Sequence, residues 1–282
     1  MITIPRPPAP LAAGWALRRL RELLERLPVS GRRALPQSVT DELPPRRLRA
    51  RAGAAGAAPY LDGGRRTAEE LVAGLRRAER DPAQLAAILD FGCGAGRVLP
   101  YIARIAPQAR SVGCDVDRAA IEWAGARRPG AEWVLSSFEP PLPFAGDTFD
   151  LVYSVSVFSH LGRGLQDRWL RELRRVLAPG GVALLSVHGP SAFEAFRSGR
   201  VRTSWCPPAV FARGPLRSRD CVFTPYTRSL WTAGELPGVG SQYGLAFHGA
   251  DFIREVWGRE LTVLDIRERA LTDWQDLVIV GR

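Results

Sequence analysis

The chain has 282 residues, 46% of them hydrophobic and 24% charged, which suits one core with an appendage better than two equal domains. No run approaches 18 uninterrupted apolar residues, and the N-terminus lacks the pattern of a secretory signal, so we expect a cytoplasmic protein without a membrane span. All 39 basic residues are arginine, and the formal net charge of +10 arises from excesses in residues 1–85 and 194–245. Such basic patches can attract phosphates, acidic glycans or anionic lipid, or simply face solvent.

Residues 1–65 are expected to form an extension that precedes the main domain. The first ten residues are rich in proline and are expected to be disordered. Over residues 11–27, Trp15 and four leucines recur at three- and four-residue steps between arginines. This spacing predicts an amphipathic helix that packs on the domain or on a partner enzyme, or that docks on a membrane surface. Residues 28–64 are rich in Pro, Gly, Ala and Arg, which is typical of an extended connector.

Thr67 and Glu70 have the spacing of a capping box and predict a helix that ends near Arg80. Short apolar runs then alternate with helical segments, an order that predicts a parallel sheet with helices on both faces. Near the end of the chain, residues 261–269 and 275–282 predict an antiparallel hairpin. The other expected strands are 85–91, 110–115, 132–135, 149–157 and 181–187, and the expected helices between them are 97–106, 118–128 and 164–177.

Residues 190–248 interrupt this alternation. They contain many Gly, Pro, Trp, Tyr and Arg residues and little periodicity. A long irregular stretch inside a compact domain is typically a functional loop. We therefore expect a main domain over residues 66–282 that carries a loop or lid insertion at about 190–248.

A glycine-rich turn, Asp90-Phe-Gly-Cys-Gly-Ala-Gly96, lies directly after an expected strand and before an expected helix. Glycines allow a tight turn and close approach of a ligand, and the N-terminus of the next helix offers free N–H groups. The following strand ends at Asp115, 19 residues after Gly96. A carboxylate at that place can accept hydrogen bonds from the ribose hydroxyls of an adenosine cofactor.

Nicotinamide-binding enzymes share this logic, but their fingerprint is G-x-G-x-x-G. The glycines here follow the pattern D-x-G-x-G-x-G, which resembles motif I of the class I methyltransferases. Four later segments resemble successive parts of the same family: VGCDVD, PLPFAGDTFDLVYSVSVFSHL, LRRVLAPGGVALLSV and LTVLDIRERALTDWQDLVIVGR. The chain is thus similar to class I, Rossmann-like S-adenosylmethionine-dependent methyltransferases of the small-molecule group over roughly residues 85–190 and 245–282.

This resemblance implies an α/β three-layer sandwich around a seven-stranded, mostly parallel sheet of order 3-2-1-4-5-7-6 with strand 7 antiparallel. It also implies that S-adenosylmethionine is the cofactor. Asp90, Gly92, Gly94, Gly96 and Arg97 would flank its methionine end, and the backbone carbonyl of Ser154 would meet its ammonium group.

For the rest of the cofactor, the resemblance implies that Asp115 holds the ribose and that Val116 contacts the adenine. Ser137 and Phe138 would also lie near the adenine, although the family commonly has an acid where this chain has Ser137. Asp117 is better placed to cap the next helix.

Three histidines are candidates for the general base that a hydroxyl acceptor would need. His160 follows the fourth strand, His188 follows the fifth, and His248 precedes the segment that leads to the hairpin. Ligands bind outside the carboxyl ends of parallel strands, which is where His160 and His188 are expected. Alternatively, these histidines shape the pocket or bond the loops. Aromatic residues that could line an acceptor pocket, or only pack in the core, are Tyr226, Trp231 and Tyr243.

The four cysteines form no CxxC pair, so we expect reduced thiols and no metal site. Together these features predict an S-adenosylmethionine-dependent methyltransferase that methylates oxygen on a small-molecule or glycan acceptor. The alternatives are a nucleic-acid methyltransferase, a catalytically inactive scaffold with a methyltransferase fold, and a nicotinamide-linked oxidoreductase. The basic charge favours a nucleic-acid substrate, but no NPPY motif is present, and no nucleic-acid partner is expected.

Overall fold

The computed structural model describes residues 43–202, 206–226 and 240–282, which belong to the second of two units into which the chain divides, Glu42–Arg282. The helix predicted over residues 11–27, and Trp231, lie outside the described residues. Within the described ranges, no helix is long and apolar enough to cross a membrane.

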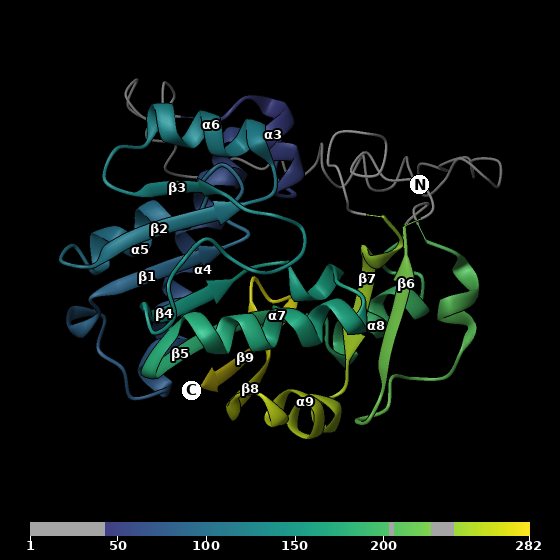
Figure 1. Cartoon of the computed structure of the whole chain (residues 1–282). Helices are drawn as coiled ribbons and strands as arrows, with labels where there is room; N and C mark the ends of the chain where they lie inside the picture. Colours follow the sequence, from purple (N-terminus) through teal and green to yellow (C-terminus); the bar gives the residue numbers. More distant parts are fainter. Residues whose placement is uncertain (1–42, 203–205, 227–239) are drawn as a thin grey trace, which may run out of the picture. The chain divides into compact units, whose positions relative to one another are not determined.

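A seven-stranded sheet forms the centre of the domain (Figure 1). Its strand order is β3-β2-β1-β4-β5-β9-β8. The first five strands of this order pair in parallel, and β9 pairs antiparallel with both β5 and β8. The strands are β1 (Ala87–Phe91), β2 (Arg110–Asp115), β3 (Glu132–Leu135), β4 (Phe149–Ser154), β5 (Leu177–Val187), β8 (Thr262–Leu271) and β9 (Gln275–Gly281).

The observed order differs in detail from the predicted order 3-2-1-4-5-7-6. Two further strands, β6 (Cys221–Pro225) and β7 (Gly244–His248), lie between β5 and the last two strands of the sheet and pair with each other in a separate sheet. The last two places in the central sheet are therefore taken by the eighth and ninth described strands, with β8 at the edge. The predicted antiparallel hairpin is confirmed, and its turn has positive φ angles at Thr272 and Asp273, as tight hairpin turns require.

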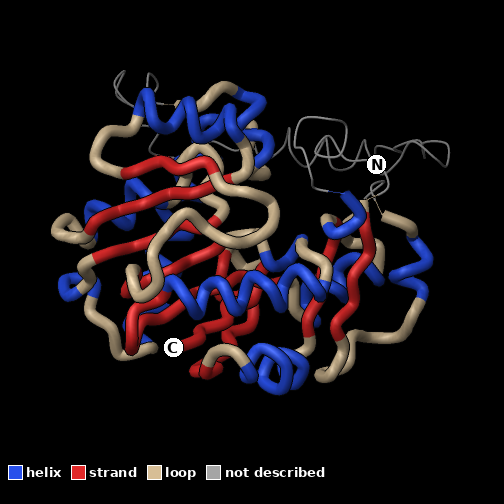
Figure 2. Tube along the Cα trace, in the orientation of Figure 1, coloured by secondary structure: helices blue, strands red, loops and turns tan. Residues whose placement is uncertain are grey.

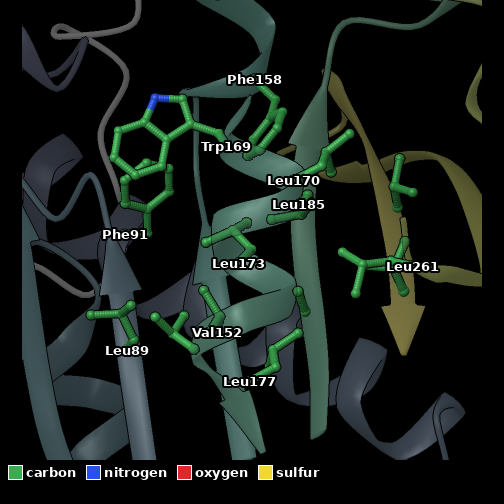
Figure 3. Packing of buried hydrophobic residues seen from close by; sticks show 14 of the residues in the cluster. Leu89, Phe91, Val152, Phe158, Trp169, Leu170, Leu173, Leu177, Leu185 and Leu261 are labelled. Atoms are coloured by element: carbon green, nitrogen blue, oxygen red, sulfur yellow. The ribbon is translucent and has the colours of Figure 1, made fainter. Parts of the chain in front are cut away.

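Helices cover both faces of the sheet (Figure 2). Successive side chains of a strand point to opposite faces. Thus Leu89 and Phe91 of β1 pack with α7, whereas Ile88 packs with α4 and α5. Figure 3 shows the first of these clusters, in which the ring centroids of Phe91 and Trp169 are 4.6 Å apart. The described α-helices are α3 (Arg46–Arg51), α4 (Ala57–Arg77), α5 (Leu99–Ile105), α6 (Arg118–Arg127), α7 (Arg163–Val176), α8 (Pro190–Arg197) and α9 (Ala250–Val256).

The segment before β1 is more helical than predicted. Residues 46–51 form α3, and α4 begins at Ala57 and runs unbroken across the expected boundary at residue 65. The capping-box prediction is wrong, because Thr67 lies buried in the middle of α4 and Glu70 accepts hydrogen bonds from the side chain of Arg66 and from the backbone of the hairpin turn. The buried positions of α4 recur at three- and four-residue steps from Tyr60 onward, so burial of one apolar face stabilises the whole helix.

The segment 190–248 was expected to be an irregular loop, but its described residues form a small folded insertion. It contains α8 and the β6–β7 pair, and it has its own apolar core. The buried aromatic residues of this core are phenylalanines rather than the tryptophans and tyrosines that suggested a lid. The buried members of the cluster are Ala192, Phe193, Cys206, Leu216, Val222, Leu245 and Phe247.

Candidate functional site

The glycine-rich turn connects β1 to the segment that enters α5. Gly92, Gly94 and Gly96 all have positive φ angles, of 82°, 55° and 71°, which L side chains rarely adopt. A Cβ atom on Gly92 would overlap the side chain of Val157, and one on Gly96 would overlap Trp133. The turn therefore depends on glycine both for its backbone conformation and for the close packing of its neighbours.

Asp115 lies at the end of β2 beside this turn. Its Oδ2 accepts a 2.7 Å hydrogen bond from the backbone N–H of Gly94, and its Oδ1 accepts a 2.8 Å bond from the N–H of Asp117. A carboxylate has about four acceptor positions, so each oxygen can still accept a hydrogen bond from a ligand. Burial raises the pKa of Asp115. Asp117 caps α6 through the N–H groups of Ala119 and Ala120, which confirms that prediction.

Asp90 is the last polar side chain of β1 and is buried. The hydroxyl of Tyr153 donates a 2.9 Å hydrogen bond to its Oδ2. Burial raises the pKa of Asp90 to about 7; the negative charge of Asp115 adds to this increase, and the bond from Tyr153 and the charge of Arg97 oppose it. Asp90 can therefore change its charge near neutral pH when a charged ligand binds beside it.

A cavity of about 410 Å³ adjoins both carboxylates. Backbone and side chains of the glycine turn, of the ends of β2 and β3, and of the loop after β4 line it. It is also lined by α3 and α4 and by the insertion. Its lining includes Arg51, Tyr60, Asp90, Gly92, Gly94, Arg97, Asp115, Val116, Ser137, Phe138, Ser156, His160, Tyr226 and Tyr243.

Most of the residues proposed from the sequence to hold the cofactor line this cavity. Two do not. Gly96 packs under the turn against Trp133, and Ser154 is buried at the end of β4, where it pairs with Leu185. The residues that follow Ser154, from 155 to 157, line the cavity.

The sequence did not reveal the contribution of α3 and α4. Tyr60 of α4 is 1% exposed and lines the cavity, and its hydroxyl has no hydrogen-bond partner within the described part of the chain. A Cβ atom on Gly64, one turn later, would overlap the backbone carbonyl of Arg97, so α4 lies directly against the glycine turn. The four-residue spacing from Tyr60 through Gly64 to Ala68 was a signal for this helix, but the adjacent Gly63 and Gly64 suggested a loop.

His160 lines the same cavity. Its Nδ1 lies 2.9 Å from the carbonyl oxygen of Gly244 and 2.9 Å from the hydroxyl oxygen of Tyr226. A carbonyl oxygen can only accept, so this contact places the proton on Nδ1 and leaves Nε2 as the unprotonated nitrogen. Burial lowers the pKa of His160, which favours the neutral imidazole.

The other two histidines do not line the cavity. His248 is buried in β7, where its Nε2 lies 3.0 Å from Oε1 of Gln166, and burial lowers its pKa to about 3. His188 is buried at the end of β5, with its Nε2 3.3 Å from Nε2 of Gln275. The prediction that these two approach the reaction centre is therefore not supported by their positions; they join the insertion to the main sheet.

Two tyrosines of the insertion complete one end of the cavity. The ring of Tyr243 lies 5.5 Å from that of His160 and 5.5 Å from that of Tyr226, and it meets Phe138 edge to face at 6.3 Å. Among the described lining residues, those with charged side chains, Arg51, Asp90, Arg97, Asp115 and Asp117, belong to the turn, to α3 or to the end of β2. The cavity thus has a charged end beside the glycine turn and an aromatic, neutral end beside His160.

The charged end fits the chemistry of S-adenosylmethionine. Asp115 retains acceptor capacity for two ribose hydroxyls, Asp90 can balance a positive charge, and Arg97 can pair with a carboxylate. The buried hydroxyl of Tyr60 can donate to the same carboxylate, which would satisfy a group that has no partner within the described chain.

Comparison with known proteins agrees with this geometry. Residues 88–181 match the family described as "Methyltransferase domain". Residues 88–181 therefore belong to a methyltransferase domain of the class I, Rossmann-like kind, with S-adenosylmethionine as its cofactor. The crystal structure of the PH0226 protein from Pyrococcus horikoshii OT3 shares the fold, with a TM-score of 0.53 and 16% identity over 76% of this chain and 87% of that chain.

Two relatives are similar over part of their length. A probable S-adenosylmethionine-dependent methyltransferase from Mycolicibacterium smegmatis is 32% identical over 58% of this chain and 56% of that protein. A malonyl-[acyl-carrier protein] O-methyltransferase from Methylococcus capsulatus is 31% identical over 47% of each protein. The chain thus matches about half the length of these relatives.

Proposed function

We propose that the protein transfers a methyl group from S-adenosylmethionine to a hydroxyl oxygen of a small-molecule or glycan acceptor. The observation that carries this proposal is that a single cavity is lined by the glycine turn and Asp115 at one end and by His160 at the other. A cofactor at the first end and an acceptor at the second would share one enclosed space. Holding two reactants together in this way can supply much of the rate of a direct displacement.

The residue roles follow from the chemistry of each end. Asp115 binds the ribose, Val116 lies beside the adenine, and Arg97 and Tyr60 hold the carboxylate of the cofactor. S-adenosylmethionine supplies an electrophilic methyl group when it is bound. His160 accepts the proton of the acceptor hydroxyl at Nε2, because Nδ1 already donates to Gly244.

The neutral, aromatic end favours a small acceptor over a nucleic acid. Nucleic-acid binding depends largely on arginine and lysine contacts to phosphates. At this end the described lining residues include Phe138, His160, Tyr226 and Tyr243 and no arginine. We therefore propose that the insertion forms the acceptor side of the site.

The test is methyl transfer from isotopically labelled S-adenosylmethionine to a panel of phenols, sugars and oligosaccharides, with bulk tRNA as a separate arm. Transfer of the labelled methyl group to a hydroxyl compound by the wild type, and loss of this transfer in His160→Gln, would support the proposal. Label in tRNA and in no hydroxyl compound would replace it with a nucleic-acid methyltransferase. Absence of binding of S-adenosylhomocysteine would remove the basis for both.

A further inference from the structure

The loop that connects the two ends of the cavity has an unusual backbone conformation. It leaves β4 at Ser154, and Ser156 within it has a φ angle of +60°. This left-handed conformation is sparsely populated by residues other than glycine, so the surrounding structure must hold it. Ser156 lines the cavity, and His160 lies four residues later on the same loop.

Two hydrogen bonds hold Ser156. Its backbone N–H donates to Oγ of Ser186 on β5 at 2.7 Å. Its own hydroxyl donates to Oε1 of Gln275 at 3.1 Å. Gln275 is the first residue of β9 and is separated from Ser156 by 119 positions in the sequence. The conformation of the loop thus depends on a residue from the far end of the chain.

The carboxamide of Gln275 is buried, and both its oxygen and its nitrogen make hydrogen bonds. Its Nε2 donates to Oγ of Ser159 at 3.2 Å and lies 3.3 Å from Nε2 of His188. Because an amide nitrogen can only donate, the second contact makes Nε2 of His188 the acceptor. Ser159 directly precedes His160. The side chain of Gln275 therefore bonds both Ser156, which lines the cavity, and Ser159, which is adjacent to His160.

We propose that Gln275 is a positioning residue that fixes the loop 155–160 so that the cofactor end and the acceptor end of the cavity are held in register. This inference rests on the proposed function, because it assumes that the cavity binds S-adenosylmethionine. Gln275 does not line the cavity itself and acts through Ser156 and Ser159. A methionine at position 275 would keep a similar shape and leave both serines and His188 without this partner.

The test compares Gln275→Met with Glu172→Met. Glu172 is also a buried polar residue; its carboxylate accepts a 2.7 Å bond from the N–H of Leu142 and pairs with Arg175, and none of these three residues lines the cavity. Both variants should lose thermal stability. Only Gln275→Met should bind S-adenosylhomocysteine about tenfold more weakly in calorimetry and exchange the backbone amides of residues 155–160 faster in the free protein.

A second pair of variants keeps the inference testable if Gln275→Met does not fold. Ser156→Ala removes the bond to Gln275 and keeps a Cβ atom, whereas Ser156→Gly removes the bond but adopts a positive φ without strain. We expect Ser156→Ala to bind S-adenosylhomocysteine about threefold more weakly than Ser156→Gly. Wild-type affinity in Ser156→Ala, or in Gln275→Met, would overturn the inference. Failure of the wild type to bind would instead overturn the proposed function.

Discussion

The two ends of the cavity are built in different ways. At the charged end, neighbouring segments of the sheet supply a turn after β1 and a carboxylate at the end of β2, joined by the hydrogen bond from Gly94 to Asp115, and α3 and α4 add Arg51 and Tyr60. The aromatic end is made by residues far apart in the sequence, since His160 meets Tyr226 and Gly244 across 66 and 84 positions. The first end depends on the central sheet that defines the fold, and the second depends on the insertion that this chain adds to that sheet. Specificity for the acceptor should therefore depend on the insertion and can change without loss of cofactor binding.

The largest expected effect is that of replacing His160, which should impair the acceptor end of the cavity and leave the cofactor end intact. His160→Gln removes the unprotonated ring nitrogen, and turnover of a hydroxyl acceptor should fall by about 1000-fold, within the range of general-base effects. The affinity for S-adenosylhomocysteine should change by less than about twofold, since the group acts on the acceptor and not on the cofactor. Labelled methyl transfer and calorimetry measure the two quantities. Equal losses in both would show that the two ends are not separable.

The next effect concerns the turn itself. Gly92→Ala forces a Cβ atom into Val157 at a positive φ angle, and the affinity for S-adenosylhomocysteine should fall by about 100-fold. Gly94→Ala is the matched control, because its φ angle is also positive but no atom lies within 4 Å of the added Cβ. It should lose about tenfold or less. A Gly92→Ala protein that binds as tightly as Gly94→Ala would contradict the packing described here.

The charged end should also respond to pH. Burial raises the pKa of Asp90 to about 7, so its ionised fraction increases as the pH rises from 6 to 8. A ligand that places a positive charge beside Asp90 favours the ionised form, so its affinity should rise with pH by up to about tenfold over this interval. Calorimetry with S-adenosylhomocysteine at several pH values measures the slope. In Asp90→Asn the affinity should be nearly independent of pH. An unchanged pH dependence in this variant would show that another group titrates.

The smallest effect concerns Tyr60. Tyr60→Phe should weaken S-adenosylhomocysteine by about fivefold, because a hydrogen bond to the ligand carboxylate is lost. The free energy of unfolding of the free protein should not decrease, since the hydroxyl has no partner within the described chain and its burial carries a cost. Calorimetry and thermal denaturation measure the two effects. A destabilised variant with normal binding would show that the hydroxyl serves the fold instead.

The sequence allowed the prediction of the parallel sheet, the glycine turn and Asp115, because each depends on a local pattern. The strands are short apolar runs, and three glycines within five positions are needed for one turn. Tyr60 and Gln275 could not be found this way, because their roles arise from long-range packing of α4 against Arg97 and of β9 against the loop 155–160. For the same reason the sequence could not show which histidine lines the cavity. All three lie near strand ends, and only their three-dimensional surroundings distinguish His160 in the cavity from His188 and His248 in the interior.

The most direct test of the account is isothermal calorimetry with S-adenosylhomocysteine on the wild type and on Asp115→Ala. The wild type should bind in the micromolar range, and the variant should bind about 100-fold more weakly, because it loses the acceptors for the ribose and the bond that positions Gly94. Glu132→Ala, an exposed residue on the neighbouring strand β3, serves as the control and should bind like the wild type. Absence of heat and of thermal stabilisation in the wild type would contradict the account.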